Sequence, residues 1–321
     1  MTGTDVHTHL VPTVGAADAA AAGLSVDANG RLLVADHAAG PAVIYRPDAL
    51  AAWLDTAGLD RALVSIPPPL YRQGLDEPSA RSWARSVNDA LFAQLAEHPR
   101  LDALGYLPFE HPEVAREELD RLAASEHPVG FTAAAGGRSV SLADPRLRPV
   151  WSRLVELDTP LLLHPGGSPD TRLDDAYLHN LIGNPHETAI AASQLLLGEV
   201  LSSYPGLRIA LVHGGGTLPA LLGRLQQGVR SRRPGVPEDI DLRAQARGLW
   251  SDCLTHDEGA LRLAAGVFGT DHLLLGSDWP FPMGYDDPLA HARDAIPEHA
   301  SRIAGTNADD YLGHRLSRGS A

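Results

Sequence analysis

Short apolar runs alternate with longer amphipathic stretches along almost the whole chain. The apolar runs lie near residues 3–9, 61–66, 101–107, 129–134, 160–164, 207–213, 249–255 and 272–277. Runs of this length are typical of strands buried on both faces, as in a parallel sheet. The stretches between them are typical of helices, and several begin with proline; they include residues 47–57, 79–97, 112–124, 145–157, 185–203 and 218–230. Eight strands with intervening helices predict an α/β fold, the (β/α)8 TIM barrel.

Residues 11–45 interrupt the alternation after the first predicted strand. The segment Asp27-Ala-Asn-Gly-Arg31 is typical of a tight turn between two short apolar arms. We therefore expect a small N-terminal hairpin insertion that covers the mouth of the barrel. No repeat or shift in composition marks a second unit, and 44% hydrophobic residues suffice for one large core. Residues 1–321 are expected to form a single domain.

Metal-ligand residue types stand at the carboxyl ends of several predicted strands. His7 and His9 are two residues apart, so they share one face of an extended strand. Three further apolar runs end at His164, His213 and Asp278. The carboxyl ends of barrel strands meet at one mouth, and imidazole and carboxylate groups are common ligands of divalent metals. The pattern predicts a metal site at that mouth.

Composition and charge argue against several classes of partner and site. A formal charge of −14 and a pI near 5.4 argue against a nucleic-acid or anionic-membrane partner and favour a small-molecule substrate. The chain has no basic and apolar leader and no run of about 18 apolar residues, so we expect a cytoplasmic protein. Its one cysteine, Cys253, excludes an internal disulfide and a cysteine-based zinc cage.

All 26 basic residues are arginine. The absence of lysine excludes Schiff-base catalysis and pyridoxal phosphate attachment. It also excludes a carbamylated lysine that bridges two metal ions. A metal centre in this chain is therefore expected to hold one ion.

Four motifs in combination carry a resemblance to a known family. They are Asp5-Val-His7-Thr-His9, Leu163-His164-Pro165, the run from Pro205 to His213 with three following glycines, and Gly276-Ser-Asp278-Trp-Pro-Phe-Pro282. The chain resembles the amidohydrolase superfamily, of the amidohydrolase 2 type, in the branch that contains α-amino-β-carboxymuconate-ε-semialdehyde decarboxylase.

The resemblance implies roles for individual residues. The metal ligands would be His7, His9, His164 and Asp278, and His213 would be the catalytic acid/base. The implied reaction is nonoxidative decarboxylation of a small unsaturated or aromatic carboxylic acid. Relatives in this branch also include lactonases and hydratases. The alternative reaction at the same site is therefore hydration, or hydrolysis of a lactone, ester or amide, in which Asp278 would shuttle the proton. A non-catalytic binding barrel is a third alternative, although all five expected site positions are filled.

Two arginines are candidates for binding a substrate carboxylate. Arg224 follows His213 by eleven residues, the spacing of a family arginine that reaches into the neighbouring subunit, and so implies a homodimer. A solvated helix arginine is the alternative reading. Arg46, in Tyr45-Arg46-Pro47, is similar to the family's second substrate arginine once a gap is allowed.

Other residues are expected near the pocket. His256 is predicted to face the mouth, and Trp279 and Phe281 to wall the pocket, with a solvated loop or simple packing as the alternatives. Gly166 and Gly167 replace an aromatic residue of the decarboxylase, which implies a roomier pocket. The His-x-His motif, in place of the Glu-x-His of resorcylate-type enzymes, favours Zn²⁺ over Mn²⁺.

Overall fold

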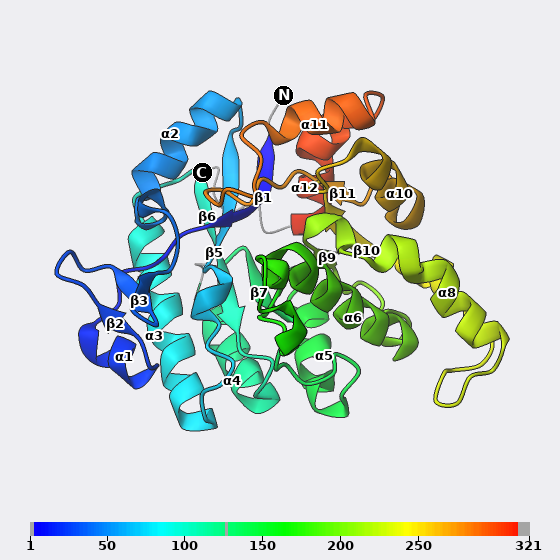
Figure 1. Cartoon of the computed structure of the whole chain (residues 1–321), viewed down its shortest axis with the longest axis horizontal. Coiled ribbons are helices and arrows are strands. Elements are labelled where there is room, and N and C mark those ends of the chain that lie inside the picture. The colour runs from blue at the N-terminus through cyan, green and yellow to red at the C-terminus, as the bar shows by residue number, and fades with distance from the viewer. Residues whose placement is uncertain (1–2, 126–127, 314–321) are drawn as a thin grey trace.

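The computed structural model describes residues 3–125 and 128–313, and its centre is a sheet of eight parallel strands (Figure 1). The strands are β1 (Thr4–His9), β5 (Arg61–Ser65), β6 (Leu101–Leu107), β7 (Gly130–Ala135), β8 (Leu161–Pro165), β9 (Ile209–Leu211), β10 (Leu249–Asp252) and β11 (Leu273–Leu274). Each strand pairs with its predecessor in this order. The carboxyl ends of all eight strands therefore lie at the same end of the sheet.

The sheet closes between its first and last strands. Isolated parallel bridges join Asp5 and Thr8 of β1 to Leu275 and Trp279, which follow β11. The backbone N–H of Val6 donates to the carbonyl of Leu275, and that of His9 to the carbonyl of Trp279, both at 2.9 Å. The result is a nearly closed barrel, which confirms the predicted TIM-barrel fold.

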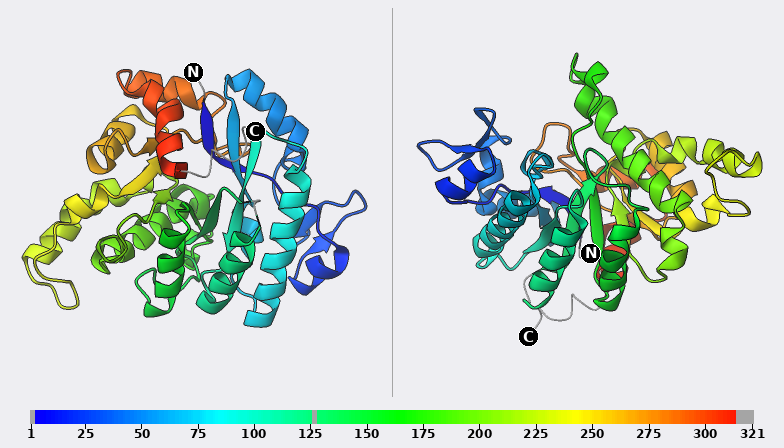
Figure 2. Two further views of the ribbon diagram at one scale, coloured as in Figure 1. Left: turned by 180° about the vertical axis from the view of Figure 1, so that it is seen from behind. Right: turned by 90° about the horizontal axis from the view of Figure 1, so that it is seen from below.

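Helices surround the barrel on its outer side (Figures 1 and 2). They are α2 (Pro47–Ala57), α3 (Glu77–Leu95), α4 (Pro112–Ala123), α5 (Arg148–Glu156), α6 (Asn184–Leu197), α7 (Val200–Ser203), α8 (Leu218–Arg230), α9 (Leu242–Ala246), α10 (Glu258–Phe268) and α11 (Pro288–Ala295). The last helix, α12 (Asn307–Leu312), packs against the interior of the barrel instead. The single helix predicted over residues 185–203 is divided into α6 and α7. The division lies at Glu199, whose left-handed backbone (φ 53°) cannot continue a helix.

The last three strands are shorter than their apolar runs predict. The ladder ends at Leu211, Asp252 and Leu274, whereas the runs predict strand to residues 213, 255 and 277. Beyond Leu274 the chain is joined to β1 by isolated bridges at Leu275 and Trp279 in place of a continuous ladder. Apolar composition alone does not mark where a buried strand ends, because a buried turn is equally apolar.

The insertion after β1 is larger than a hairpin. It contains α1 (Ala16–Ala21) and an antiparallel sheet of β2 (Ser25–Val26), β3 (Leu32–Val34) and β4 (His37–Ala38). The predicted turn joins β2 to β3, where Asp27 Oδ1 accepts the backbone N–H groups of Asn29 and Arg31 at 2.8 and 2.9 Å. β4 adds a third strand to the predicted pair.

The insertion lies at the side of the barrel. α1 packs against α3, and the whole unit sits at the margin of the molecule beside that helix (Figure 1). The buried side chains Ala19, Ala22 and Leu24 join the main apolar core. This apolar contact holds the insertion beside α3, and Arg72, in the loop after β5, donates to the carbonyl of Ala22 at 2.8 Å. The insertion therefore borders the mouth on one side, whereas the sequence predicts that it covers the mouth.

A separate apolar cluster lies within the ring of strands. Seven strands contribute to it through Val6, Leu63, Leu104, Leu162, Ala210, Trp250 and Leu274, and α12 contributes Ala308, Tyr311 and Leu312. The Trp250 and Tyr311 rings are 5.6 Å apart. The barrel interior is thus filled with side chains and closed by α12.

In the described ranges, no helix has both the length and the hydropathy to cross a bilayer.

Glu110, which follows β6, yields a prediction about stability. Burial raises its pKa to about 7 from 4.5, and neither carboxyl oxygen has a hydrogen-bond partner among residues 3–125 and 128–313. The native state therefore binds more protons than the unfolded chain between these values, and stability falls as the pH rises through them. We expect Glu110→Gln to raise the free energy of unfolding by about 1–2 kcal/mol at pH 8 and to have little effect below pH 5.

Urea denaturation at the two pH values measures this difference. Glu97→Gln is the matched control, because Glu97 is exposed and should show no such dependence. An effect of Glu110→Gln that is equal at both pH values would contradict the assignment.

Candidate metal centre and active site

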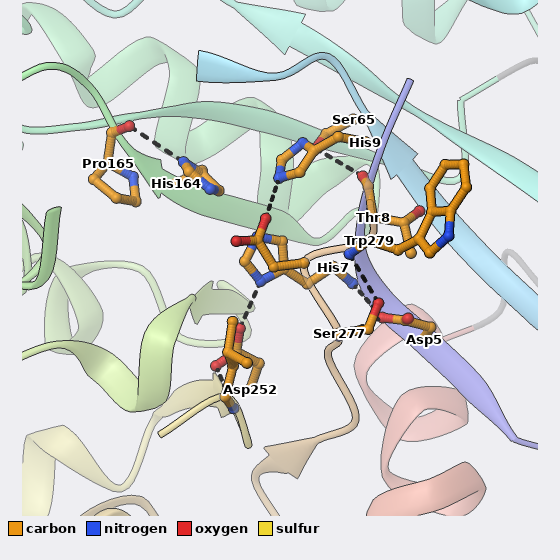
Figure 3. Close-up of polar contacts among 12 residues, drawn as sticks. Asp5, His7, Thr8, His9, Ser65, His164, Pro165, Asp252, Ser277 and Trp279 are labelled. Carbon is orange, nitrogen blue, oxygen red and sulfur yellow. Dashed lines mark hydrogen bonds and ion pairs between the residues drawn. The ribbon is translucent and has the colours of Figure 1, made fainter. Parts of the chain in front are cut away.

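Four potential metal ligands from distant parts of the sequence meet at the barrel mouth. His7 and His9 lie on β1, His164 on β8, and Asp278 in the segment beyond β11. All four are buried, and each offers a ligand atom that lies within 4.8 Å of those of the others. Figure 3 shows the three imidazoles directed toward a common point. The structure therefore brings together the four residues that the sequence predicts as ligands.

Hydrogen bonds fix the imidazoles of His7 and His164 in the same tautomer. His7 Nδ1 is 2.8 Å from a carboxylate oxygen of Asp252, and His164 Nδ1 is 3.2 Å from the carbonyl of Pro165 (Figure 3). Carboxylate and carbonyl oxygens only accept hydrogen bonds, so each Nδ1 carries the proton. The Nε2 atom of each ring is then left with a lone pair.

His9 follows the same arrangement through a hydroxyl group. The Ser65 hydroxyl donates to the carbonyl of Thr8 at 3.3 Å, and its oxygen lies 3.0 Å from His9 Nδ1. When the Ser65 hydroxyl donates to Thr8, its oxygen accepts the Nδ1 proton of His9. All three imidazoles thus present an Nε2 lone pair, which is the form that binds a metal ion.

The atoms that face the common point lack hydrogen bonds. His7 Nε2 and His9 Nε2 lie 3.5 and 3.1 Å from Asp278 Oδ1. All three atoms are buried, and none forms a hydrogen bond within the described part of the chain. Buried polar atoms without partners are costly. A divalent cation with three nitrogen donors and one oxygen donor would satisfy them together, so the residues fit one metal ion.

The charges in the cluster also suit a cation. Burial alone would raise the pKa of Asp278, but the neighbouring His7 and His9 lower it, so the carboxylate is ionised. Burial lowers the pKa of His9, and burial together with the nearby histidines holds the pKa of His164 well below its usual value. For His7, burial is outweighed by the Asp278 and Asp252 carboxylates, which raise its pKa. A metal ion would replace the proton that these carboxylates favour on His7.

His213 lies beside the four candidate ligands. Its ring centroid is 5.3 Å from those of both His7 and His164. Burial, reinforced by His7, lowers its pKa to about 4, so the ring is neutral at pH 7. A neutral imidazole at this position can accept a proton, as a general base must.

The backbone around His213 adopts an uncommon conformation. His213 has φ 59°, and Gly214, Gly215 and Gly216 have φ 64°, 76° and 61°. A Cβ atom on Gly216 would lie 2.2 Å from the carbonyl of Pro185. The three glycines thus permit a left-handed turn and its close packing on α6. Asp278 (φ 60°) also has a left-handed backbone, and such residues cluster at functional sites.

Three supporting residues escaped the sequence analysis. Asp252 and Ser65 hold the Nδ1 atoms of two histidines, as described above. The third, Asp5, accepts the backbone N–H groups of His7 at 3.0 Å and Ser277 at 3.1 Å and so links β1 to the segment beyond β11. Ser65 and Asp252 are the last residues of β5 and β10. Serine is not a common metal ligand, and the run that contains Asp252 is predicted to extend to residue 255, so the signal that identified His164 marked neither residue.

A cavity of about 390 Å³ adjoins His213 and Asp278. Its lining is largely apolar, with Leu181, Leu254, Leu263 and Met283 among the contributors. Cavities of this size and character hold small organic ligands. No arginine belongs to this lining in the described chain.

The predicted substrate-binding residues occupy different surroundings. His256 lines the cavity, and its ring lies 5.2 Å from that of Tyr285. Phe281 is half-buried, with its ring 5.4 Å from that of His9. Trp279 is buried, and its ring centroid lies 6.4 Å from that of Trp53, so it contributes to packing.

The two candidate arginines lie away from the cavity of their own chain. Arg46 precedes α2 and Arg224 lies on α8, and both are exposed. Neither belongs to the cavity lining. Within one chain, therefore, the structure does not bring either arginine to the site.

Two curated proteins are similar to this chain in sequence. A 2-amino-3-carboxymuconate-6-semialdehyde decarboxylase of Dictyostelium discoideum is 28% identical over 276 residues, covering 84% of this chain and 77% of that protein. A gamma-resorcylate decarboxylase of Rhodococcus jostii (strain RHA1) is 28% identical over 251 residues, covering 71% of this chain and 75% of that protein.

A solved structure shares the fold. The dihydroxybenzoic acid decarboxylase of Polaromonas sp. JS666, with bound manganese and 2-nitroresorcinol, superposes with a TM-score of 0.78 at 22% identity, covering 99% of this chain and 98% of that one. The family model described as amidohydrolase matches residues 4–313. This match covers nearly the whole chain and confirms the resemblance found in the motifs: the protein belongs to the amidohydrolase family.

Proposed function

We propose that this protein is a mononuclear, metal-dependent nonoxidative decarboxylase of a small unsaturated or aromatic carboxylic acid. The observation that carries the proposal is the buried cluster of three Nε2 lone pairs and one carboxylate, with His213 beside it at the edge of a cavity. The curated relatives reported above are decarboxylases, which favours this reaction over hydrolysis or hydration at the same site.

The proposed reaction moves one proton. The bond between the substrate carbon and its carboxylate breaks, carbon dioxide leaves, and the electron pair remains on the carbon, which then takes a proton. His213 faces the cavity as a neutral imidazole, so it can take a proton from water there and deliver it to that carbon. The hydroxide that remains combines with the released carbon dioxide to form bicarbonate, which balances the reaction. A divalent ion held by the four ligands would attract the oxygen atoms of the substrate. Asp278, which also lines the cavity, is the second proposed catalytic group.

Zinc is the proposed ion. Three imidazole nitrogens and one carboxylate oxygen are a common zinc ligand set, and nitrogen donors favour zinc over manganese. Manganese is the alternative, since it is the ion bound to the Polaromonas enzyme.

The one cysteine, Cys253, is buried and unpaired, which suits the proposed cytoplasmic location.

We also propose a homodimer in which Arg224 binds the substrate carboxylate across the interface. Two observations support it: no arginine of the described chain lines the cavity, and Arg224 is exposed on α8, whose first turn does line it. Leu181 and Leu263, each 47% exposed, lie at the cavity and Ile182 is 51% exposed nearby. Exposed apolar groups of this kind are typical of interfaces. Arg46, His256 and Phe281 remain candidate substrate contacts.

Metal binding tests the ligand set. We expect the purified protein to bind one zinc ion per chain and to melt at a higher temperature when zinc is added. His164→Ala should lose both properties, because it removes one of four ligands. Elemental analysis after dialysis and thermal denaturation measure them, with His37→Ala, at an exposed position on β4, as the control. Wild-type protein without bound metal would contradict the proposal.

Product analysis tests the reaction. The candidate substrates are acids for which similar decarboxylases are named: 2,6-dihydroxybenzoate, 5-carboxyvanillate, 6-methylsalicylate and 2-amino-3-carboxymuconate 6-semialdehyde. We expect the zinc-loaded enzyme to release carbon dioxide from at least one of them, and His213→Asn to reduce kcat by about 10²–10⁴-fold while it retains zinc. In ¹⁸O-labelled water, the product should contain no new oxygen; incorporation without carbon dioxide release would favour hydrolysis or hydration instead.

Mixed dimers test the position of Arg224. Arg224→Ala and His213→Asn should each be inactive alone, but unfolding and refolding them together should restore about a quarter of wild-type activity. Random pairing makes half of the dimers mixed. In each mixed dimer, one of the two sites has a wild-type His213 from one chain and a wild-type Arg224 from the other. Arg230→Ala, an exposed position on the same helix, is the control and should stay active. No recovery in the mixture would place Arg224 outside the neighbouring site.

A further inference from the structure

Asp252, at the end of β10, uses both carboxylate oxygens inside the site. Oδ2 accepts the proton of His7 Nδ1 at 2.8 Å, and Oδ1 accepts the backbone N–H groups of Gly214 at 2.8 Å and Leu254 at 3.2 Å. The residue is completely buried. Gly214 directly follows His213, so one carboxylate contacts both a candidate metal ligand and the turn that carries the candidate acid/base.

We propose that Asp252 is a positioning residue that holds His7 and His213 in one arrangement. The part of this role that concerns His213 rests on the proposed function. The part that concerns His7 rests only on metal binding and stands without any assigned reaction.

The contact with His7 determines which nitrogen is available to the metal. An imidazole that loses its acceptor at Nδ1 can carry its proton on either nitrogen. With Asp252 in place, Nδ1 carries the proton and Nε2 points to the common point, as Figure 3 shows. Loss of such a partner typically costs about 10–100-fold in metal affinity or activity.

The contact with Gly214 determines where His213 lies. No hydrogen bond to the His213 ring is formed within residues 3–125 and 128–313, and its Nδ1 is buried without a partner. The position of the ring therefore depends on its backbone. That backbone is a left-handed turn whose other N–H bonds, from Gly215 and Gly216, are local to the turn. The bond from Gly214 ties the turn to β10.

A carboxylate can accept hydrogen bonds at both oxygens, from His7 and from the backbone N–H groups, whereas the nearly isosteric amide can accept at only one. If the oxygen of an Asp252→Asn side chain faces His7, its NH₂ group faces the N–H groups of Gly214 and Leu254, so donor meets donor. In the opposite orientation, the NH₂ group donates to His7 Nδ1 and forces the proton onto Nε2, which then cannot bind a metal. Asp252→Asn thus disrupts one contact or the other with little change in volume.

Ser65→Ala is the matched comparison. It removes the corresponding Nδ1 partner of His9, but Ser65 has no hydrogen bond to the His213 turn. In chelator-competition titrations, both variants should bind zinc less tightly, Asp252→Asn by about 10–100-fold. In crystals of the zinc-loaded proteins, His213 and its turn should move in Asp252→Asn and stay in place in Ser65→Ala.

Kinetics at saturating zinc adds a third readout, with the acid that the wild type converts fastest. We expect kcat to fall further in Asp252→Asn than in Ser65→Ala, with KM nearly unchanged. Wild-type zinc affinity in Asp252→Asn, or an unmoved His213, overturns the proposal. If no acid is converted, the proposed function fails, and the titration and the crystals still decide the role of Asp252.

A measurement on the unaltered enzyme covers the case in which Asp252→Asn does not fold. In zinc-loaded protein labelled with ¹⁵N-histidine, the NMR spectrum should show His7 with a proton on Nδ1 and none on Nε2. A His7 ring protonated at Nε2 overturns the proposal.

Discussion

The closure of the barrel places a carboxylate against two imidazoles in a buried position. β1 carries His7 and His9, and Asp278 follows β11, so the ligands meet only where the first and last strands join. The backbone N–H of Asp278 donates to the carbonyl of His7 at 2.8 Å, which fixes this junction. In this position Asp278 Oδ1 and the two Nε2 atoms have no hydrogen-bond partner in the described chain. A single divalent ion would satisfy all three atoms.

The network around the cluster follows from that constraint. Each imidazole needs an acceptor at Nδ1 so that Nε2 keeps its lone pair, and the surrounding strands supply a carboxylate, a hydroxyl and a carbonyl. β9 and β11 end before their apolar runs do, and His213 and Asp278, which lie beyond these two strands, have left-handed backbones. The fold thus supplies rigid strand ends, and the short turns beyond them supply the reactive groups.

Much of the site was predictable because buried strands have a clear signature. Histidine or aspartate at the end of an apolar run identified His7, His9, His164, His213 and Asp278, and the structure brings these five side chains together. Asp252 was missed because its apolar run was predicted to extend to residue 255, whereas β10 ends at Asp252 itself. The position of the insertion was not predictable, because it depends on the contact between α1 and α3, which are far apart in sequence. The surroundings of Arg224 also depend on contacts beyond a single chain.

The most direct test of the metal centre is a crystal structure of the zinc-loaded protein with anomalous data at the zinc edge. The account predicts one anomalous peak about 2.0–2.2 Å from the Nε2 atoms of His7, His9 and His164 and from a carboxylate oxygen of Asp278. A peak at other residues, or two peaks at this position, would contradict it.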